Sequence, residues 1–135
     1  MQVLNYLFFN GNCEEAVKFY ERALGAKIEM LSRYKESPEP MPEGMVPKGW
    51  DDKVMHVSMR IGESTVMASD SPDGGTFKGI QLSINTKSLS QAKEVFAALS
   101  EGGQVTMPLD KTFWSDGFGS LNARLGAPWM ANVDR

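Results

Sequence analysis

The chain has 135 residues, of which 41% are hydrophobic and 10% aromatic, enough for one compact domain or two small fused modules. The formal net charge is −3, and neither sign forms a long run, so we expect no nucleic-acid partner and no membrane partner. The single cysteine, Cys13, excludes an internal disulfide, and no signal-like segment or long apolar run is present. We therefore expect a globular, cytoplasmic protein.

The first half of the chain begins with a nearly all-apolar segment at residues 3–9, typical of a strand buried on both faces. Asn12 is a potential helix N-cap with Glu15 three residues later, and apolar residues then recur at helical spacing as far as Leu24. Gly25 is placed to end that helix. Strand-like segments follow at residues 27–34, 54–61 and 65–69.

The segment 35–53 between two of these strands has no apolar periodicity and contains Pro38, Pro40, Pro42 and Pro47. Structureless connections of this length are uncommon inside compact domains. The segment is either a mobile lid over a site or a tolerated insertion.

The second half repeats the same order of elements. A strand is predicted at residues 80–85, a helix opened by Ser88 with Gln91 and ended by Gly102, and strands at 104–109, 119–125 and 129–133. A shift of 76 positions places Asn12 on Ser88, which indicates an internal duplication. We predict an α+β fold of two tandem βαβββ modules, residues 1–70 and 79–135, joined by a turn-rich linker at 71–78.

Several motifs resemble one known protein family. They are Tyr6–Ala16, the FYxxxLG pattern that ends at Gly25, Asp52–His56, and Thr112-Phe113-Trp114 after a Met-Pro-Leu strand. Together they are similar to the PhnB-like branch of the vicinal-oxygen-chelate superfamily, which includes glyoxalases, bleomycin-resistance proteins and dioxygenases. The resemblance implies two modules that form a cupped mixed sheet, a small-molecule ligand inside the cup, and a homodimer.

Several relatives hold a divalent metal through the first and last strands of each module. The corresponding positions here fall near Asn5, Ala68, Gly79 and Met130, and none of these residues is a good ligand for a divalent ion. The single histidine excludes a His-rich transition-metal site, whereas counting leaves a carboxylate-only Mg²⁺ site open. We expect no metal ligands and no cofactor.

His56 is the candidate catalytic residue. Strand alternation places it with Ser58 and Arg60 on one face, which either lines the cup or is simply the polar side of a strand. Phe113 and Trp114 either stack on a flat ligand or pack in the core or a dimer interface. The predicted ligand pocket consists of Asn5, Leu7, His56, Ser58, Ala68, Gly79, Phe113, Trp114 and Met130.

Two functions remain open at this stage. The first is a metal-independent small-molecule-binding protein with an unknown ligand. The second is a metal-independent enzyme, a lyase, isomerase or methyltransferase-like protein, with His56 as acid or base. The methyltransferase reading lacks support from any glycine-rich nucleotide-binding loop. Cys13 near a helix N-terminus is either a stabilised thiolate or, as its place in the apolar stripe favours, a buried packing thiol.

Overall fold

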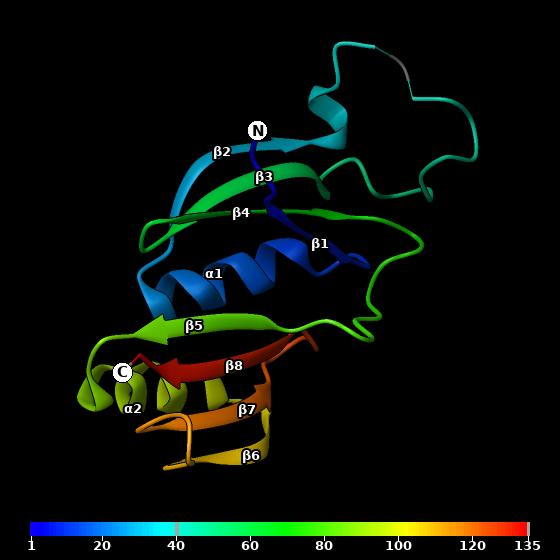
Figure 1. Cartoon of the computed structure of the whole chain (residues 1–135). Coiled ribbons are helices and arrows are strands. Elements are labelled where there is room, and N and C mark those ends of the chain that lie inside the picture. The colour runs from blue at the N-terminus through cyan, green and yellow to red at the C-terminus, as the bar shows by residue number, and fades with distance from the viewer. Residues whose placement is uncertain (40, 135) are drawn as a thin grey trace. The chain divides into compact units, whose positions relative to one another are not determined.

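The computed structural model describes residues 1–39 and 41–134. The fold is α+β and divides into two compact units, Met1–Thr76 and Phe77–Arg135. Each unit combines an α-helix with a four-stranded mixed sheet, in the order βαβββ (Figure 1). The predicted fold class of two tandem βαβββ modules is therefore confirmed.

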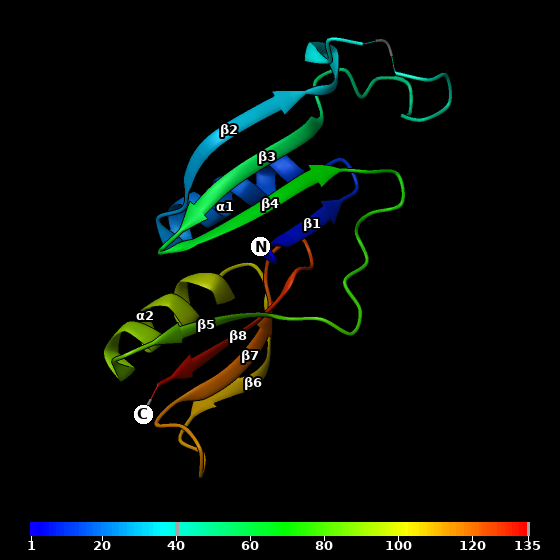
Figure 2. The same cartoon turned by 45° about the horizontal axis from the view of Figure 1, so that its top comes forward.

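In the first unit β1 runs parallel to β4, and β3 is antiparallel to both of its neighbours, β4 and β2. Figure 2 shows the strand order β1-β4-β3-β2 with α1 along one face of the sheet. A short 3-10 turn follows β2 at Tyr34–Glu36. The elements are β1 (Asn5–Phe9), α1 (Cys13–Leu24), β2 (Lys27–Arg33), β3 (Val54–Ile61) and β4 (Ser64–Asp70).

The second unit has the same topology, with strand order β5-β8-β7-β6 and β5 parallel to β8. Its predicted strands are present with bounds that shift by up to three residues. The clearest difference is at Leu125, predicted as strand, which instead has a left-handed backbone (φ 73°) in the turn after β7. The elements are β5 (Leu82–Thr86), α2 (Leu89–Ser100), β6 (Gln104–Asp110), β7 (Phe118–Asn122) and β8 (Pro128–Val133).

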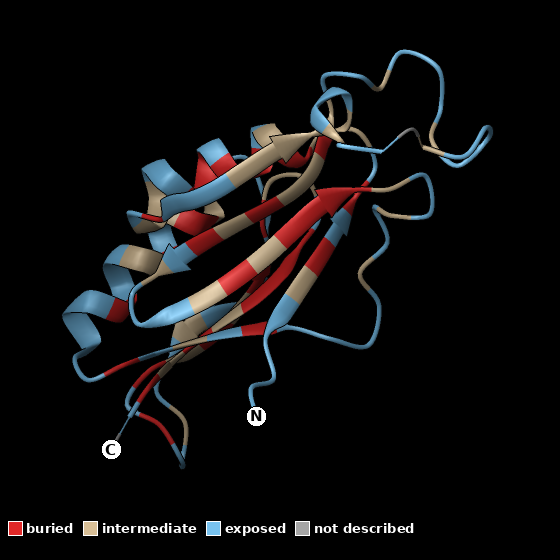
Figure 3. Ribbon diagram, turned by 90° about the horizontal axis from the view of Figure 1, so that it is seen from above, coloured by how far each residue is buried: buried red, intermediate tan, exposed pale blue. Residues whose placement is uncertain are grey.

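The core of the first unit lies between α1 and its sheet. Alternate residues of the two central strands, among them Val57, Met59 and Ala68, are fully buried, as the red bands in Figure 3 show. The residues between them are less buried, because successive side chains of a strand point to opposite faces. From α1 the buried residues are Cys13, Ala16, Val17, Phe19 and Tyr20.

The prediction that the first strand is buried on both faces is wrong. Leu7 and Phe9 are buried, but Phe8 is 50% exposed and Tyr6 is only half-buried. β1 is an edge strand paired with β4 alone, and α1 covers one face of the sheet. An all-apolar strand predicts burial of both faces, but within this unit the second face is not covered by a helix.

The predicted side-chain cap of α1 is also wrong. Asn12 makes no side-chain capping hydrogen bond. Instead the carboxylate of Asp70, at the end of β4, accepts hydrogen bonds from the backbone N–H groups of Gly11 (2.8 Å) and Cys13 (2.9 Å). An anion at a helix N-terminus accepts hydrogen bonds from backbone N–H groups that have no partner within the helix, and it complements the helix dipole. Asp70, 57 positions after Cys13 in the sequence, therefore caps α1 in place of Asn12.

Two of the other predicted helix ends are confirmed, whereas the C-cap of α2 is Glu101 and not Gly102. Ser88 accepts a hydrogen bond from the backbone N–H of Gln91 at the start of α2 (3.1 Å), and Gly25 ends α1 in a left-handed conformation (φ 67°) that suits glycine. No helix in residues 1–39 and 41–134 is long and apolar enough to cross a membrane.

Candidate functional site

The face of the first sheet opposite α1, called the distal face from here on, carries a mixed set of side chains. One row across the four strands is set by the register, in which Tyr6 of β1 pairs with Met67, Met67 with Ser58, and Ser58 with Met30 of β2. His56 pairs with Ser32 in the adjoining row. The distal face therefore combines aromatic rings and thioethers with a hydroxyl and an imidazole.

A hydrogen bond joins the aromatic and polar parts of this face. The hydroxyl of Tyr6 lies 3.0 Å from Nδ1 of His56, in a half-buried position. The two rings are 5.6 Å apart between centroids, and the ring of Phe8 is 4.8 Å from that of Tyr6. Tyr6, Phe8 and His56 form a continuous ring surface, which we call the aromatic cluster.

Two polar groups beside the aromatic cluster are available to a ligand. Within the described part of the chain, Nε2 of His56 and the hydroxyl of Ser58 have no hydrogen-bond partner, and neither atom is buried. Arg60, farther along β3, is 3.6 Å from Glu29 between Nε and Oε2. Since unmatched polar atoms at an apolar surface give orientation to a bound small molecule, His56 and Ser58 are the candidate contacts.

The structure does not bring all the predicted pocket residues of this unit together. Leu7 and Ala68 are register partners on the face beneath α1 and are 5% and 0% exposed. His56 and Ser58 flank Val57, the other register partner of Ala68, and thus lie on the distal face. Asn5 lies two residues before Leu7, so its side chain points to the same face of β1, and it is exposed at the start of the strand.

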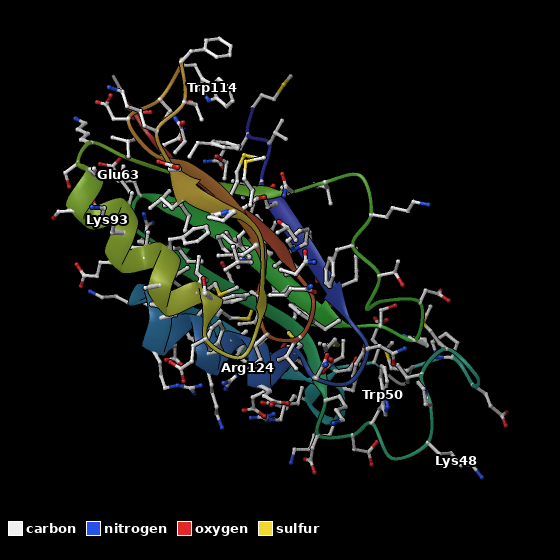
Figure 4. All side chains as sticks on the ribbon, turned by 90° about the horizontal axis from the view of Figure 1, so that it is seen from below. Lys48, Trp50, Glu63, Lys93, Trp114 and Arg124 are labelled. Carbon is white, nitrogen blue, oxygen red and sulfur yellow. The ribbon has the colours of Figure 1, made fainter. Side chains whose placement is uncertain are left out.

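The other four predicted pocket residues belong to the second unit. Met130 is half-buried in β8, in register with Ser83 and Ser120. Gly79 precedes β5 rather than lying within it. Phe113 and Trp114 lie in the loop before β7, 90% and 50% exposed, with their rings packed edge to face at 4.8 Å, and Figure 4 shows Trp114 projecting from that loop.

The residues at the family's metal positions do not suit a divalent ion. Asn5 offers one weak neutral oxygen, Ala68 is a buried methyl beneath α1, and Gly79 has no side chain and lies outside β5. In residues 1–39 and 41–134 no three His, Cys, Asp or Glu side chains gather into a group that could hold a metal ion.

A separate cavity of about 570 Å³ lies at the N-terminus of α1, and it contains none of the predicted pocket residues. Its charged side chains are largely paired with one another or with the backbone. Arg33 binds both carboxylate oxygens of Glu14 (3.0 and 2.7 Å), and Lys53 donates to the carbonyl of Gly11 (2.7 Å). The lining residues are Gly11, Asn12, Glu14, Glu15, Lys18, Arg33, Asp52, Lys53, Val54 and Asp70.

The charged groups of this cavity connect neighbouring elements of the fold, so we call the cavity and the contacts around it the structural junction. Asp70 is 1% exposed, and its second oxygen accepts from the backbone N–H of Val54 (3.0 Å). The hydrogen bond from Arg33 lowers the pKa of the Glu14 carboxyl. Burial, together with the negative charges of Asp70 and Glu14, raises the pKa of the Cys13 thiol. A buried neutral thiol is inert, as the packing interpretation of Cys13 expects.

The same junction anchors both ends of the proline-rich segment. The backbone N–H of Tyr34 donates to the carbonyl of Lys53 (3.1 Å), and that of Lys35 donates to Asp51 (3.0 Å). The rings of Tyr34 and Trp50 are 6.4 Å apart, and Trp50 is labelled in Figure 4. The choice between lid and insertion stays open, but the two strand ends that flank the segment are pinned together.

Two residues that organise these regions were missed by sequence reasoning. Tyr6 belongs to an apolar run in which nothing marks it as the partner of a histidine 50 residues later. Tyr6 and Phe8 point to the same face of β1, and this alternation would have indicated an aromatic surface once that face was known to lack a covering helix. Asp70 could have been suspected as a carboxylate that ends an apolar strand, but its contacts with Gly11 and Cys13 follow from the β1–β4 pairing.

Similarity to known proteins covers nearly the whole chain. "Protein YjdN" of Escherichia coli K12 is 34% identical, over 98% of this chain and 95% of that protein. The crystal structure of protein PA1353 from Pseudomonas aeruginosa is 39% identical, with a TM-score of 0.86 and coverage of 99% of this chain and 98% of that one. A Bacillus cereus structure described as "Putative 3-demethylubiquinone-9 3-methyltransferase, PhnB protein" is 26% identical, with a TM-score of 0.78 and coverage of 98% and 99%.

These relatives support the PhnB-like branch that the motifs around Phe19-Tyr20 and Thr112-Phe113-Trp114 resemble. The family model described as "Glyoxalase/Bleomycin resistance protein/Dioxygenase superfamily" matches residues 2–126. With a βαβββ unit in each half of the chain, the protein belongs to the glyoxalase/bleomycin resistance protein/dioxygenase superfamily.

Proposed function

We propose that this protein binds a small molecule on the distal face of its first sheet without a metal. The observation that carries the proposal is the Tyr6–His56 hydrogen bond beside the half-exposed ring of Phe8. A partly apolar surface with a few fixed polar groups is the usual composition of a small-molecule site. Ser58, with its accessible hydroxyl in the neighbouring row, would supply a second polar contact.

The proposal does not require a catalysed reaction. The alternative is a metal-independent lyase, isomerase or methyltransferase-like enzyme, in which His56 acts as acid or base. The accessible Nε2 atom favours this alternative, because a catalytic imidazole must reach the substrate. The name of the Bacillus cereus relative suggests methyl transfer, and a thermal shift with S-adenosylmethionine as the added compound tests that version directly.

A ligand screen by thermal shift on wild type and His56→Ala tests the site. A compound that binds the folded state raises the unfolding temperature, and we expect compounds that stabilise the wild type to lose most of that effect in His56→Ala. Glu63→Gln is the matched control, since Glu63 is exposed in the turn after the same strand. Equal responses of wild type and His56→Ala to every stabilising compound would remove His56 from the site.

Elemental analysis of protein purified without chelator tests metal independence. The proposal expects no stoichiometric Zn, Ni, Fe, Mn or Mg. One equivalent of any of these ions would overturn the metal-free part of the proposal and would indicate a site with carboxylate ligands.

The resemblance also leads us to propose a homodimer in the cytoplasm. The edge strand β6 offers exposed apolar side chains, Val105 and Met107, which a partner would cover. Light scattering coupled to size exclusion gives the molar mass. A mass near the 14.9 kDa of one chain at micromolar concentration would exclude a stable dimer.

A further inference from the structure

The contact between Tyr6 and His56 constrains the tautomer of the imidazole as well as its position. A neutral imidazole has one N–H donor and one lone-pair acceptor, and the partner of one nitrogen decides which tautomer is present. In this pair the heavy atoms, the Tyr6 oxygen and Nδ1, are 3.0 Å apart. Either atom could donate, and the balance depends on the chemistry of the two groups.

The phenol is the better donor of the two. Its O–H is more acidic than the N–H of a neutral imidazole, and the imidazole lone pair is the stronger base, so O–H to Nδ1 is the stronger hydrogen bond. Nδ1 of His56 then carries no proton, and the ring proton resides on Nε2. Within the described residues, Nε2 has no partner and is not buried.

We infer that Tyr6 is a positioning residue that holds His56 as the Nε2–H tautomer, so that the distal face presents a hydrogen-bond donor and takes flat, apolar ligands with an acceptor oxygen. This inference rests on the proposed function and names its ligand class. The acceptor is a carbonyl or carboxylate oxygen that receives the Nε2–H. The flat part of the ligand lies against the aromatic cluster of Tyr6, Phe8 and His56.

The surroundings agree with a ligand that accepts hydrogen bonds. The Ser58 hydroxyl, which has no hydrogen-bond partner among the residues that the structure describes, lies on the same face, and Arg60 on β3 adds positive charge, partly offset by Glu29. Met67 lies between Tyr6 and Ser58 in the cross-strand row and supplies an adaptable apolar contact. In this tautomer the neutral ring has no lone pair to offer a ligand at Nε2, so Nε2 of His56 donates a hydrogen bond and does not act as a base.

The chain contains one histidine, so long-range ¹H–¹⁵N correlation of protein labelled with ¹⁵N-histidine gives a single ring pattern. Spectra are recorded where the ring is neutral. We expect an unprotonated Nδ1 and a protonated Nε2 in the wild type, and a mixture of tautomers in Tyr6→Phe, which keeps the aromatic ring and removes the hydroxyl. Ser58→Ala is the control, because that hydroxyl has no hydrogen bond to His56, and it should leave the pattern unchanged.

A protonated Nδ1 in the wild type, or an identical pattern in Tyr6→Phe, would overturn the role of Tyr6. Neither result depends on any ligand, so the proposed binding at the distal face could still be true. Conversely, failure of the ligand screen would leave the tautomer result standing. A purely structural role of Tyr6 would change stability without moving the tautomer signal.

The ligand class is tested with two probes that share a ring, benzoate and benzylammonium. We expect benzoate to shift the His56 Nε2 resonance more than benzylammonium, and its affinity to fall about twofold in Tyr6→Phe, since only the molecules with the Nε2–H tautomer, about half of an even mixture, then bind. Equal shifts with both probes, a larger shift with benzylammonium, or no shift with either would overturn the ligand class.

Discussion

Replacing Asp70 by alanine should destabilise the first unit more than any change at an exposed carboxylate. The carboxylate is 1% exposed and accepts three backbone hydrogen bonds, from Gly11 (2.8 Å), Cys13 (2.9 Å) and Val54 (3.0 Å). Alanine would leave all three donors without an acceptor and remove the negative charge at the N-terminus of α1. The perturbation therefore combines lost hydrogen bonds, a lost helix cap and a small cavity.

The magnitude follows from these contacts. A hydrogen bond to a charged group contributes about 1.5–3 kcal/mol net, and an anion at a helix N-terminus adds about 0.3–1 kcal/mol or more. The contributions overlap, and water can reach some of the donors, so we expect a loss of about 3–5 kcal/mol. This is a large share of the 5–15 kcal/mol that is usual for a domain.

Urea unfolding followed by circular dichroism measures the loss, with Asp73→Ala as the control because Asp73 is exposed in the following turn. Hydrogen exchange adds a local reading, since the amides of Gly11, Cys13 and Val54 should lose protection in Asp70→Ala. A loss below about 1 kcal/mol, the size expected of a surface substitution, with protection of those amides unchanged, would refute the reasoning. The stability of Asp70→Asn should lie between those of the wild type and Asp70→Ala, because an amide keeps one acceptor oxygen but turns its NH₂ toward a backbone donor.

Two further predictions concern the same junction. Cys13 is fully buried and its pKa is raised, so a thiol reagent such as Ellman's reagent should modify it only after unfolding; rapid stoichiometric reaction of the native protein would contradict its burial. The pKa of Glu14 is lowered from its ordinary value of 4.5 by Arg33, so the ion pair contributes stability above that value, and the contribution disappears as pH falls through the folded pKa. The stability difference between wild type and Glu14→Gln in urea should thus be present at neutral pH and vanish once the pH is low enough to protonate Glu14 in the folded protein. A difference that stays unchanged after that carboxyl is protonated in the folded protein would exclude the ion pair as its cause.

Much of the fold could be predicted from local patterns. The helical stripe from Cys13, the glycine stop at Gly25 and the Ser88 cap each depend on residues within a few positions of one another, and such short-range rules need no tertiary information. The alternation in β3 likewise placed His56 and Ser58 on one face and Val57 on the other. The family resemblance joined these elements into two βαβββ units.

The errors share a physical cause, because each concerns a residue whose environment is decided by a distant strand. β1 looked buried on both faces, yet Phe8 is half exposed because only one side of the sheet carries a helix in this unit. Leu7 and Ala68 were predicted to line the pocket, Ala68 from the alignment, and the β1–β4 register places both of them beneath α1. The local sequence indicates which residues of a strand share a face, but it does not indicate which of the two faces packs against α1.

The sequence by itself determined the class of fold and the repeat of elements, because residue type and short-range periodicity suffice for these. Only the tertiary structure decided that Tyr6 meets His56 and that Asp70 caps α1. Both contacts connect β1, or the turn after it, to strands 50 or more residues later. Hydrogen bonds at that separation exist only once the order β1-β4-β3-β2 has formed, so no local pattern encodes them.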